Sequence, residues 1–145
     1  MFSLQPNRVL VPTDFSEQSC QAVEVALAIV DRADKLTVLH VATPLNEFLA
    51  GDPAIVWESE SEDSRADQLQ GMLRDRFKDE KFDNVRFDVV FGSPAEKIVK
   101  FAEKDQTELI VLPSHGRTGL ARLMIGSVAE RVVRLAHCPV LVLRS

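Results

Sequence analysis

The stretch "VRFDVVFGSPAEKIVKFAEKDQTELIVLP", residues 85–113, contains the clearest signals of secondary structure in the chain. Its first part, Val85–Gly92, alternates apolar and polar residues in the manner of a β-strand. The middle part, Ser93–Asp105, has the signals of a helix start. The last part, Glu108–Pro113, is a short apolar run ended by proline and predicts a second strand. A strand, a helix and a strand in this order indicate a parallel β-α-β unit.

Two helix starts carry capping-box spacing. Ser93 is followed by Pro94 in the first helical position and by Glu96 three residues after the serine. Ser127 and Glu130 have the same spacing further along the chain. In a capping box the serine hydroxyl accepts a hydrogen bond from a first-turn amide and the glutamate returns one. We therefore expect Ser93 and Ser127 to be helix caps.

The same alternation of elements extends outward from this unit in both directions. The apolar run "RVLVP" reads as a strand buried on both faces and "PVLVL" as a further strand, and apolar residues at helical spacing lie between them. A long connection with an acidic run, Glu58–Asp63, reads as a solvated helix start favoured by the helix dipole. We expect further strands at Arg8–Pro12, Lys35–Val41 and Pro139–Leu143, and further helices at Ser16–Ala33, Arg65–Asp79 and Ser127–His137.

This order predicts an α/β fold, a doubly wound five-stranded parallel sheet in one domain, residues 1–145. Right-handed crossovers leave few strand orders. Ligands of such sheets bind beyond the carboxyl ends of the strands, where the winding reverses. If the first and fourth strands are neighbours, the loops "PTDFS" and "PSHGRTG" meet at that crevice.

Composition narrows the class of protein. The chain has 145 residues, of which 46% are hydrophobic and 27% charged, as in a soluble globular domain. Its longest apolar runs are too short to span a membrane, and the N-terminus lacks the pattern of a signal peptide. Cys20 and Cys138 fit neither a disulfide framework nor a metal motif. We expect reduced, buried thiols and a cytoplasmic protein without a membrane partner.

Charge is unevenly distributed. The net charge is −5, but residues 113–145 contain five arginines and one acid, so this part carries +4 and the remainder −9. An acidic chain is a poor binder of nucleic acid along a broad surface. A local basic segment suits a small anion, and we expect no nucleic-acid partner.

The basic segment contains the glycine-rich stretch "LPSHGRTGLARLMIGSV", residues 112–128. Glycines let a chain bend and approach a phosphate closely, and a helix N-terminus adds unpaired N–H groups. Gly126 and Ser127 directly precede a helix, and Arg117 could add charge. The alternative is that Gly116 only makes a turn and Ser127 only caps a helix. The stretch is neither a Walker motif nor GxGxxG.

Together with "RVLVPTDFS" and "HCPVLVL", this stretch resembles the universal stress protein (UspA-like) family over nearly the whole chain. The ATP-binding branch of that family has Gly-x2-Gly-x9-Gly-Ser/Thr after its fourth strand. Gly116, nine further residues, Gly126 and Ser127 match it, but Pro113 replaces the first glycine. The proline ring is either tolerated beside a ribose or crowds it. The resemblance implies a Rossmann-like fold of the adenine nucleotide alpha hydrolase type, with ATP and Mg²⁺ as ligands.

The resemblance also implies roles for individual residues. Pro12, Thr13 and Asp14 would lie by the nucleotide, with Asp14 near the adenine or ribose, although Asp14 could equally cap a helix. A backbone group of Val41 would read the adenine edge. His115 is expected to contact phosphate or solvent. We expect the amides around residues 116 and 126–128, including that of Val128, to converge into an anion seat.

Three functions follow from these features. The leading one is a stress-response protein that binds ATP or a related adenine nucleotide, not an enzyme beyond slow hydrolysis or self-phosphorylation of Ser127 or Thr118. The alternative, favoured by Pro113, is a nucleotide-free dimeric interaction module. A phosphotransfer enzyme is the third. An apolar edge strand invites pairing, and relatives dimerise through it, so we expect an antiparallel homodimer through Pro139–Leu143.

Overall fold

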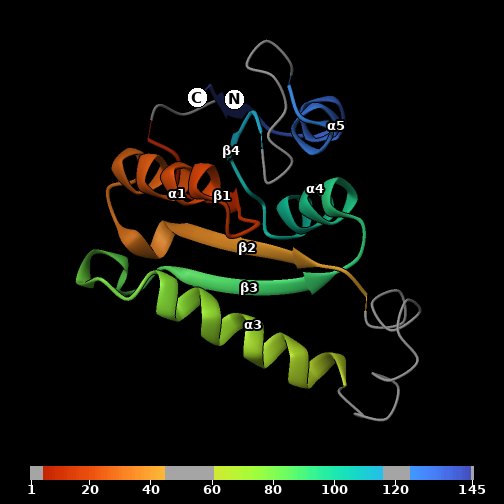
Figure 1. Cartoon of the computed structure of the whole chain (residues 1–145). Helices are drawn as coiled ribbons and strands as arrows, with labels where there is room; N and C mark the ends of the chain where they lie inside the picture. The colour runs from red at the N-terminus through yellow and green to blue at the C-terminus, as the bar shows by residue number, and fades with distance from the viewer. Residues whose placement is uncertain (1–4, 45–60, 116–124, 145) are drawn as a thin grey trace.

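We describe the protein from a computed structural model, which defines residues 5–44, 61–115 and 125–144 (Figure 1). The expected architecture is confirmed: five parallel strands form one sheet in the order β3-β2-β1-β4-β5. The elements are β1 (Val9–Pro12), α1 (Glu17–Ile29), the 3-10 turn η1 (Ala33–Lys35), β2 (Leu36–Ala42), α3 (Glu62–Arg76), the 3-10 turn η3 (Glu80–Phe82), β3 (Arg86–Phe91), α4 (Pro94–Lys104), β4 (Leu109–Pro113), α5 (Ser127–Leu135) and β5 (Val140–Leu143).

The winding of the sheet reverses between its two central strands, β1 and β4, which are neighbours as expected. β1 pairs with β2 along its whole length, but with β4 only at Val9↔Leu109 and Leu10↔Ile110. Beyond these pairs each strand continues to a proline beside its other neighbour, β1 beside β2 and β4 beside β5. β1 and β4 therefore separate after Leu10 and Ile110, and a crevice begins between their carboxyl ends.

Helices cover both faces of the sheet. One buried cluster joins side chains of α1, α3 and the strands, and a second joins α4, α5 and the strands. Val9 and Val11 belong to the first cluster and Leu10 to the second, because successive strand residues point to opposite faces. The central strands are thus buried on both sides, which explains their unbroken apolar sequences.

The helix starts differ from expectation in two places. Ser16 and Ser61 cap α1 and α3 by accepting hydrogen bonds from first-turn amides. Ser93 occupies the cap position of α4, but its side chain makes no capping bond; its ψ is 125°, against 156° at Ser16 and 159° at Ser61. We attribute the missing bond to this rotation before Pro94. The second capping box is also wrong, because Gly126 is the cap of α5 and Ser127 is its first helical residue.

The ends of several elements shift by a few residues. α1 stops at Ile29 rather than Ala33, and α3 begins at Glu62 rather than Arg65, with its acids in the first turn. Cys20 is buried and Cys138 half-buried, and both are free thiols whose pKa is raised by burial. Among the described helices, none is long and apolar enough to cross a bilayer.

Candidate functional site

A cavity of about 260 Å³ lies at the carboxyl end of the sheet, in the crevice between β1 and β4. It is built from the ends of β1, β2 and β4 and from the first turns of helices. Its lining residues are Pro12, Thr13, Asp14, Ser19, Val41, Pro94, Ile98, Leu112, Pro113, Ser114, His115, Gly126, Ser127, Val128 and Ala129. Nine of the eleven residues expected from sequence at a nucleotide site are therefore brought together here. The other two, Gly116 and Arg117, lie outside the described residues.

The first wall is the loop after β1, which is held rigidly by its own polar groups. The Thr13 N–H donates to Leu39 O (2.8 Å), and the Thr13 hydroxyl is hydrogen-bonded to Ser19 Oγ (2.8 Å). The same hydroxyl accepts from the N–H of Phe15 (3.1 Å), a residue with a φ of 67°. A non-glycine residue in this left-handed region requires support from its surroundings. The fixed turn places Thr13 and Ser19 hydroxyls on the cavity.

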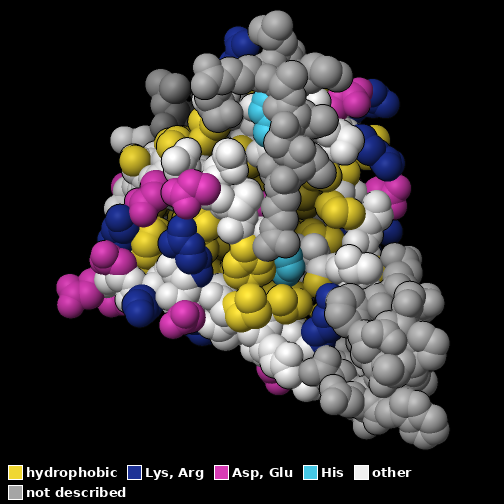
Figure 2. Space-filling view, viewed as in Figure 1, with side chains coloured by type: hydrophobic (Ala, Val, Ile, Leu, Met, Phe, Trp, Pro, Cys, Tyr) yellow, Lys and Arg dark blue, Asp and Glu magenta, His cyan; other side chains and the backbone are white. Residues whose placement is uncertain are grey.

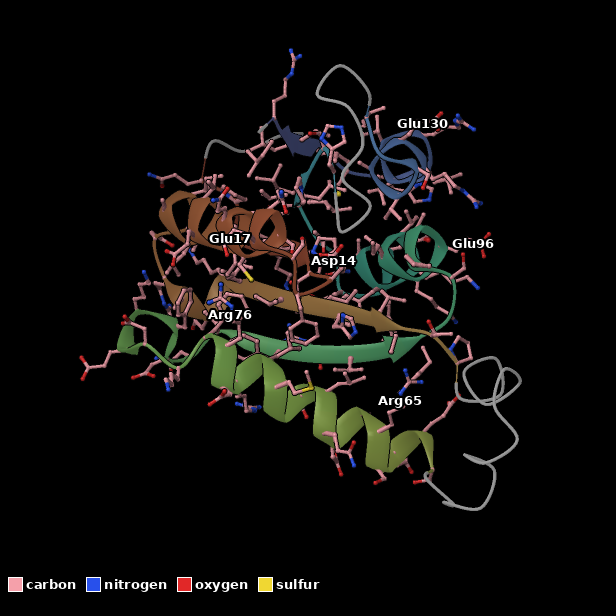
Figure 3. The ribbon with its side chains drawn as sticks, viewed as in Figure 1. Asp14, Glu17, Arg65, Arg76, Glu96 and Glu130 are labelled. Atoms are coloured by element: carbon pink, nitrogen blue, oxygen red, sulfur yellow. The ribbon has the colours of Figure 1, made fainter. Side chains whose placement is uncertain are left out.

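Asp14 and His40 complete this wall. Asp14 Oδ1 accepts a hydrogen bond from the Ser16 N–H (2.9 Å), so the carboxylate shapes the turn while Ser16 caps α1. Figure 3 shows Asp14 at the foot of α1, on the side that faces α4. His40 Nδ1 donates to Thr13 O (2.8 Å), and its ring meets Phe15 edge-on. His40 thus supports the turn after β1, and Asp14 both shapes the loop and lines the cavity.

The end of β2 contributes the backbone of Val41. In a strand, the peptide groups of alternate residues point to the same side. Leu39 O faces β1, where it accepts from Thr13 N–H, whereas Ala42 O faces β3 and accepts from Gly92 N–H (3.0 Å). The N–H and C=O of Val41 therefore face the β1 side, just beyond the point where β1 ends. A planar base could form hydrogen bonds with these two groups of Val41.

The second wall follows β4 and centres on Ser114, which sequence analysis did not select. Its N–H donates to Leu143 O (2.8 Å), and its hydroxyl is hydrogen-bonded to His115 Nδ1 (3.2 Å). Ser114 and His115 are both buried. The side chain of Pro113 lies beside them on the cavity lining. Polar side chains of this wall are thus buried only because each has a partner.

Glycine is required at residue 126 by close approach. A Cβ there would lie 2.9 Å from Ser114 O, a distance that side-chain carbons do not tolerate. The Gly126 N–H donates to the same carbonyl at 2.6 Å. The expectation that this amide serves an anion is therefore wrong, because the chain itself uses the donor.

The first turn of α5 offers other N–H donors to an anion. The N–H groups of the first residues of a helix have no acceptor within the helix, and Ser127, Val128 and Ala129 line the cavity. Gly126 offers no side chain to cap them. The positive end of the helix dipole adds to these donors. The arrangement is a ready seat for an anionic group.

An apolar wall from α4 is another part of the cavity lining that sequence analysis did not select. Pro94 and Ile98 line the cavity opposite the loop after β1, together with Leu112 of β4. Ile98 is only 2% exposed. Its helical spacing in the sequence marks it as a core residue, but only the packing of α4 on the sheet brings it to this crevice. A flat apolar group would find van der Waals contact there.

The described arginines of the basic segment do not point into the cavity. Arg131 pairs with Glu96 (3.1 Å), and Arg134 pairs with Glu130. Figure 3 shows both glutamates on the outer side of α4 and α5. On the face shown in Figure 2, Lys and Arg side chains alternate with Asp and Glu around a central hydrophobic group. The described lining residues include no Lys or Arg, so an anion in this cavity would depend on backbone N–H groups.

Metal ligands are sparse. Within residues 5–44, 61–115 and 125–144, no group of three His, Cys, Asp or Glu side chains could hold a metal ion. Asp14 is the single carboxylate among the lining residues. A cation at this site would depend on ligand oxygens more than on the protein.

The crevice, the strand order and the open start of α5 define an α/β protein with a ligand site at the reversal of its winding. The family model for the universal stress protein family matches residues 6–144, and the chain belongs to this family. It is 33% identical to Universal stress protein MJ0531 of Methanocaldococcus jannaschii, over 94% of this chain and 81% of that protein.

Solved structures agree with this assignment. The structure of the MJ0577 protein has a TM-score of 0.72 at 28% identity and covers 96% of both chains. A universal stress protein crystallised in complex with cAMP has a TM-score of 0.69 at 24% identity, over 98% of this chain and 99% of that one. At 24% identity, the comparison with the cAMP complex supports the fold alone.

Proposed function

We propose that the cavity binds an adenine nucleotide, ATP or a related one, and that the protein acts in stress response through this binding. The observation that carries the proposal is the first turn of α5: its residues Ser127, Val128 and Ala129 line the cavity, and its cap Gly126 has no side chain to accept their N–H groups. Phosphate oxygens are the natural acceptors for such a turn. The family member in complex with cAMP holds an adenine nucleotide on the same fold.

The remaining walls suit the other parts of a nucleotide. The base would lie against Ile98 and Val41, with the peptide groups of Val41 at its polar edge. The hydroxyls of Thr13 and Ser19 and the carboxylate of Asp14 stand on the same wall and would face the sugar. Pro113 remains on the lining without an N–H to donate. Gly116 and Arg117 would add contacts to the phosphates. Mg²⁺ would be bound through the phosphate oxygens.

We propose no enzymatic turnover for this site. Nucleophilic catalysis needs a nucleophile, a base and a group that orients the base. Among the described residues, Ser114 and His115 are hydrogen-bonded to each other, but both side chains are buried and therefore poorly accessible. We therefore expect binding of nucleotide without rapid hydrolysis, in a cytoplasmic protein.

We further propose that the protein forms a homodimer through Pro139–Leu143. β5 is an edge strand of the sheet, and Leu141 is 38% exposed. The opposite edge is protected differently, because Gln70 Nε2 from α3 donates to Phe87 O of β3 (2.6 Å). Covered edges resist pairing and bare apolar edges invite it. The contrast favours β5 as the pairing strand.

Isothermal titration calorimetry with ATP and Mg²⁺ tests the proposed ligand. Ser127→Pro removes one amide donor, and the backbone before it is suitable because Gly126 has φ −67° and ψ 156°. Proline is well tolerated in the first position of a helix. A hydrogen bond to a charged group contributes about 1.5–3 kcal/mol, so we expect affinity to fall about tenfold to a hundredfold.

The matched control is Glu17→Pro at the first position of α1, where the cap Ser16 has the same φ and ψ. Figure 3 shows Glu17 directed toward Arg76 of α3, and Glu17 does not line the cavity. Ser127→Ala separates the hydroxyl from the amide. Saturable binding that Ser127→Pro weakens and Glu17→Pro does not supports the site. No saturable binding at millimolar nucleotide would support the nucleotide-free interaction module instead.

A further inference from the structure

Ser114 is bonded to both the cavity wall and the last strand. Its N–H donates to the carbonyl of Leu143, at the end of β5 (2.8 Å), and its carbonyl accepts the N–H of Gly126, the cap of α5 (2.6 Å). Its side chain holds the ring of His115 (3.2 Å). Ser114 is 8% exposed. Through one buried residue, two hydrogen bonds thus connect the start of α5 to the end of β5.

The two backbone segments are tightly packed where α5 meets Ser114. A Cβ on Gly126 would lie 2.9 Å from Ser114 O, so the two backbones are as close as their atoms allow. Densely packed contacts of this kind transmit displacements instead of absorbing them. A movement of the first turn of α5 must therefore be shared by Ser114.

The hydrogen bonds that start at α5 and pass through Ser114 end at β5, which has one edge turned away from β4. Pro139 O accepts from Ile110 N–H (3.1 Å) and Leu143 O from Ser114 N–H, so the peptide groups of the odd-numbered residues face β4. By the alternation of strands, the peptide groups of Val140 and Val142 face the opposite side. In the described part of the chain, β5 pairs only with β4.

We propose that Ser114 is a positioning residue that links occupancy of the cavity to pairing of the β5 edge with a second copy of the chain. The proposal rests on the proposed function. A ligand held by the amides of Ser127 and Val128 fixes α5 against Ser114, and Ser114 fixes Leu143. An edge that is already ordered loses less entropy on pairing, so ligand and second copy favour each other.

Reciprocity makes the linkage measurable. If saturating nucleotide tightens the dimer by a given factor, each of the two sites in the dimer must bind nucleotide more tightly than the monomer does by the square root of that factor. We expect the dimer dissociation constant, from sedimentation velocity over a dilution series, to fall at least about fivefold in saturating ATP and Mg²⁺. The affinity of diluted, monomeric protein for ATP should be lower by the square root of that factor, at least about twofold.

Val142→Pro supplies a monomer at high concentration. Its lost N–H faces the outer edge, so the bonds from β5 to β4 remain, and proline is accepted at such edge positions. We expect this variant to be monomeric and to bind ATP with the affinity of the diluted wild type. If it fails to fold, the dilution series of the wild type still decides the question.

Gly126→Ala tests the route through Ser114, because the added Cβ forces residue 126 and Ser114 apart. We expect its linkage factor to fall toward 1. Gly71→Ala on α3 is the matched control, since nothing lies within 4 Å of a Cβ there, and it should keep the wild-type factor.

Nucleotide binding with a dimer constant that does not change would overturn the linkage and leave the proposed function intact. A linkage factor unchanged in Gly126→Ala would overturn the role of Ser114. A protein that stays monomeric at all concentrations, with or without ATP, would overturn the linkage together with the proposed dimer. Absence of nucleotide binding would overturn the proposed function itself.

Discussion

α1 and α5 begin with the same backbone geometry but differ in the side chain of their cap residue. Their cap residues, Ser16 and Gly126, share φ −67° and ψ 156°. At α1 the Ser16 hydroxyl accepts the N–H of Ser19 (3.2 Å), so the helix satisfies its own first turn. At α5 the cap has no side chain, and the corresponding amides line a cavity. A helix start without a capping side chain leaves backbone donors for a ligand.

The largest effect is expected when α5 is made to resemble α1. Gly126→Ser would bring a hydroxyl to the amide of Ala129 and a Cβ to within 2.9 Å of Ser114 O. We expect ATP affinity to fall by more than about tenfold, and overpacking to lower the free energy of unfolding by about 1–3 kcal/mol. Calorimetry and urea denaturation measure the two effects. Gly71→Ser is the control, and wild-type affinity in Gly126→Ser would break the comparison.

The reverse change at α1 should affect stability alone. Ser16→Ala removes the cap, which costs about 1 kcal/mol of unfolding free energy, and Ser16 is not among the residues that line the cavity. We expect ATP affinity within about twofold of the wild type. Urea denaturation with calorimetry of the same sample checks both values. A large loss of affinity here would show that the α1 start belongs to the site after all.

The smallest effect concerns the charge near the start of α5. Glu130 lies in its first turn and pairs with Arg134 on the outer side (Figure 3). Glu130→Gln removes a negative charge near the phosphate seat, and exposed charges at helix ends contribute about 0.3–1 kcal/mol. We expect ATP affinity to rise about twofold at low salt and the gain to disappear at high salt, because salt screens exposed charges. A fall in affinity would contradict a phosphate at this helix end.

The fold could be read from the sequence because its signals are repeated. Five apolar runs and the intervening helical patterns gave the strand count and the parallel arrangement, and the crevice followed from the winding rule. Cap chemistry was less certain. The spacing of Ser127 and Glu130 fits a capping box, yet Gly126 is the cap, because its approach to Ser114 O fixes where the helix begins.

The site was predicted where it depends on loops and missed where it depends on packing. Thr13, Asp14 and Ser127 could be selected because each follows a strand or opens a helix. Ile98 and Ser114 could not, since nothing local distinguishes them from other core residues. The use of the Gly126 amide by Ser114 O was equally hidden, because these two residues are close in space but twelve positions apart in the chain.

The most direct test is a ¹H–¹⁵N NMR titration of the intact protein with ATP and Mg²⁺. Amides that donate to phosphate shift downfield, so we expect the largest downfield shifts at Ser127, Val128 and Ala129. The amides of Glu17 and Gln18, in the equivalent turn of α1, should not move. Saturation with ATP that leaves the three α5 amides in place, or that shifts the α1 amides equally, would contradict a phosphate seat at the uncapped start of α5.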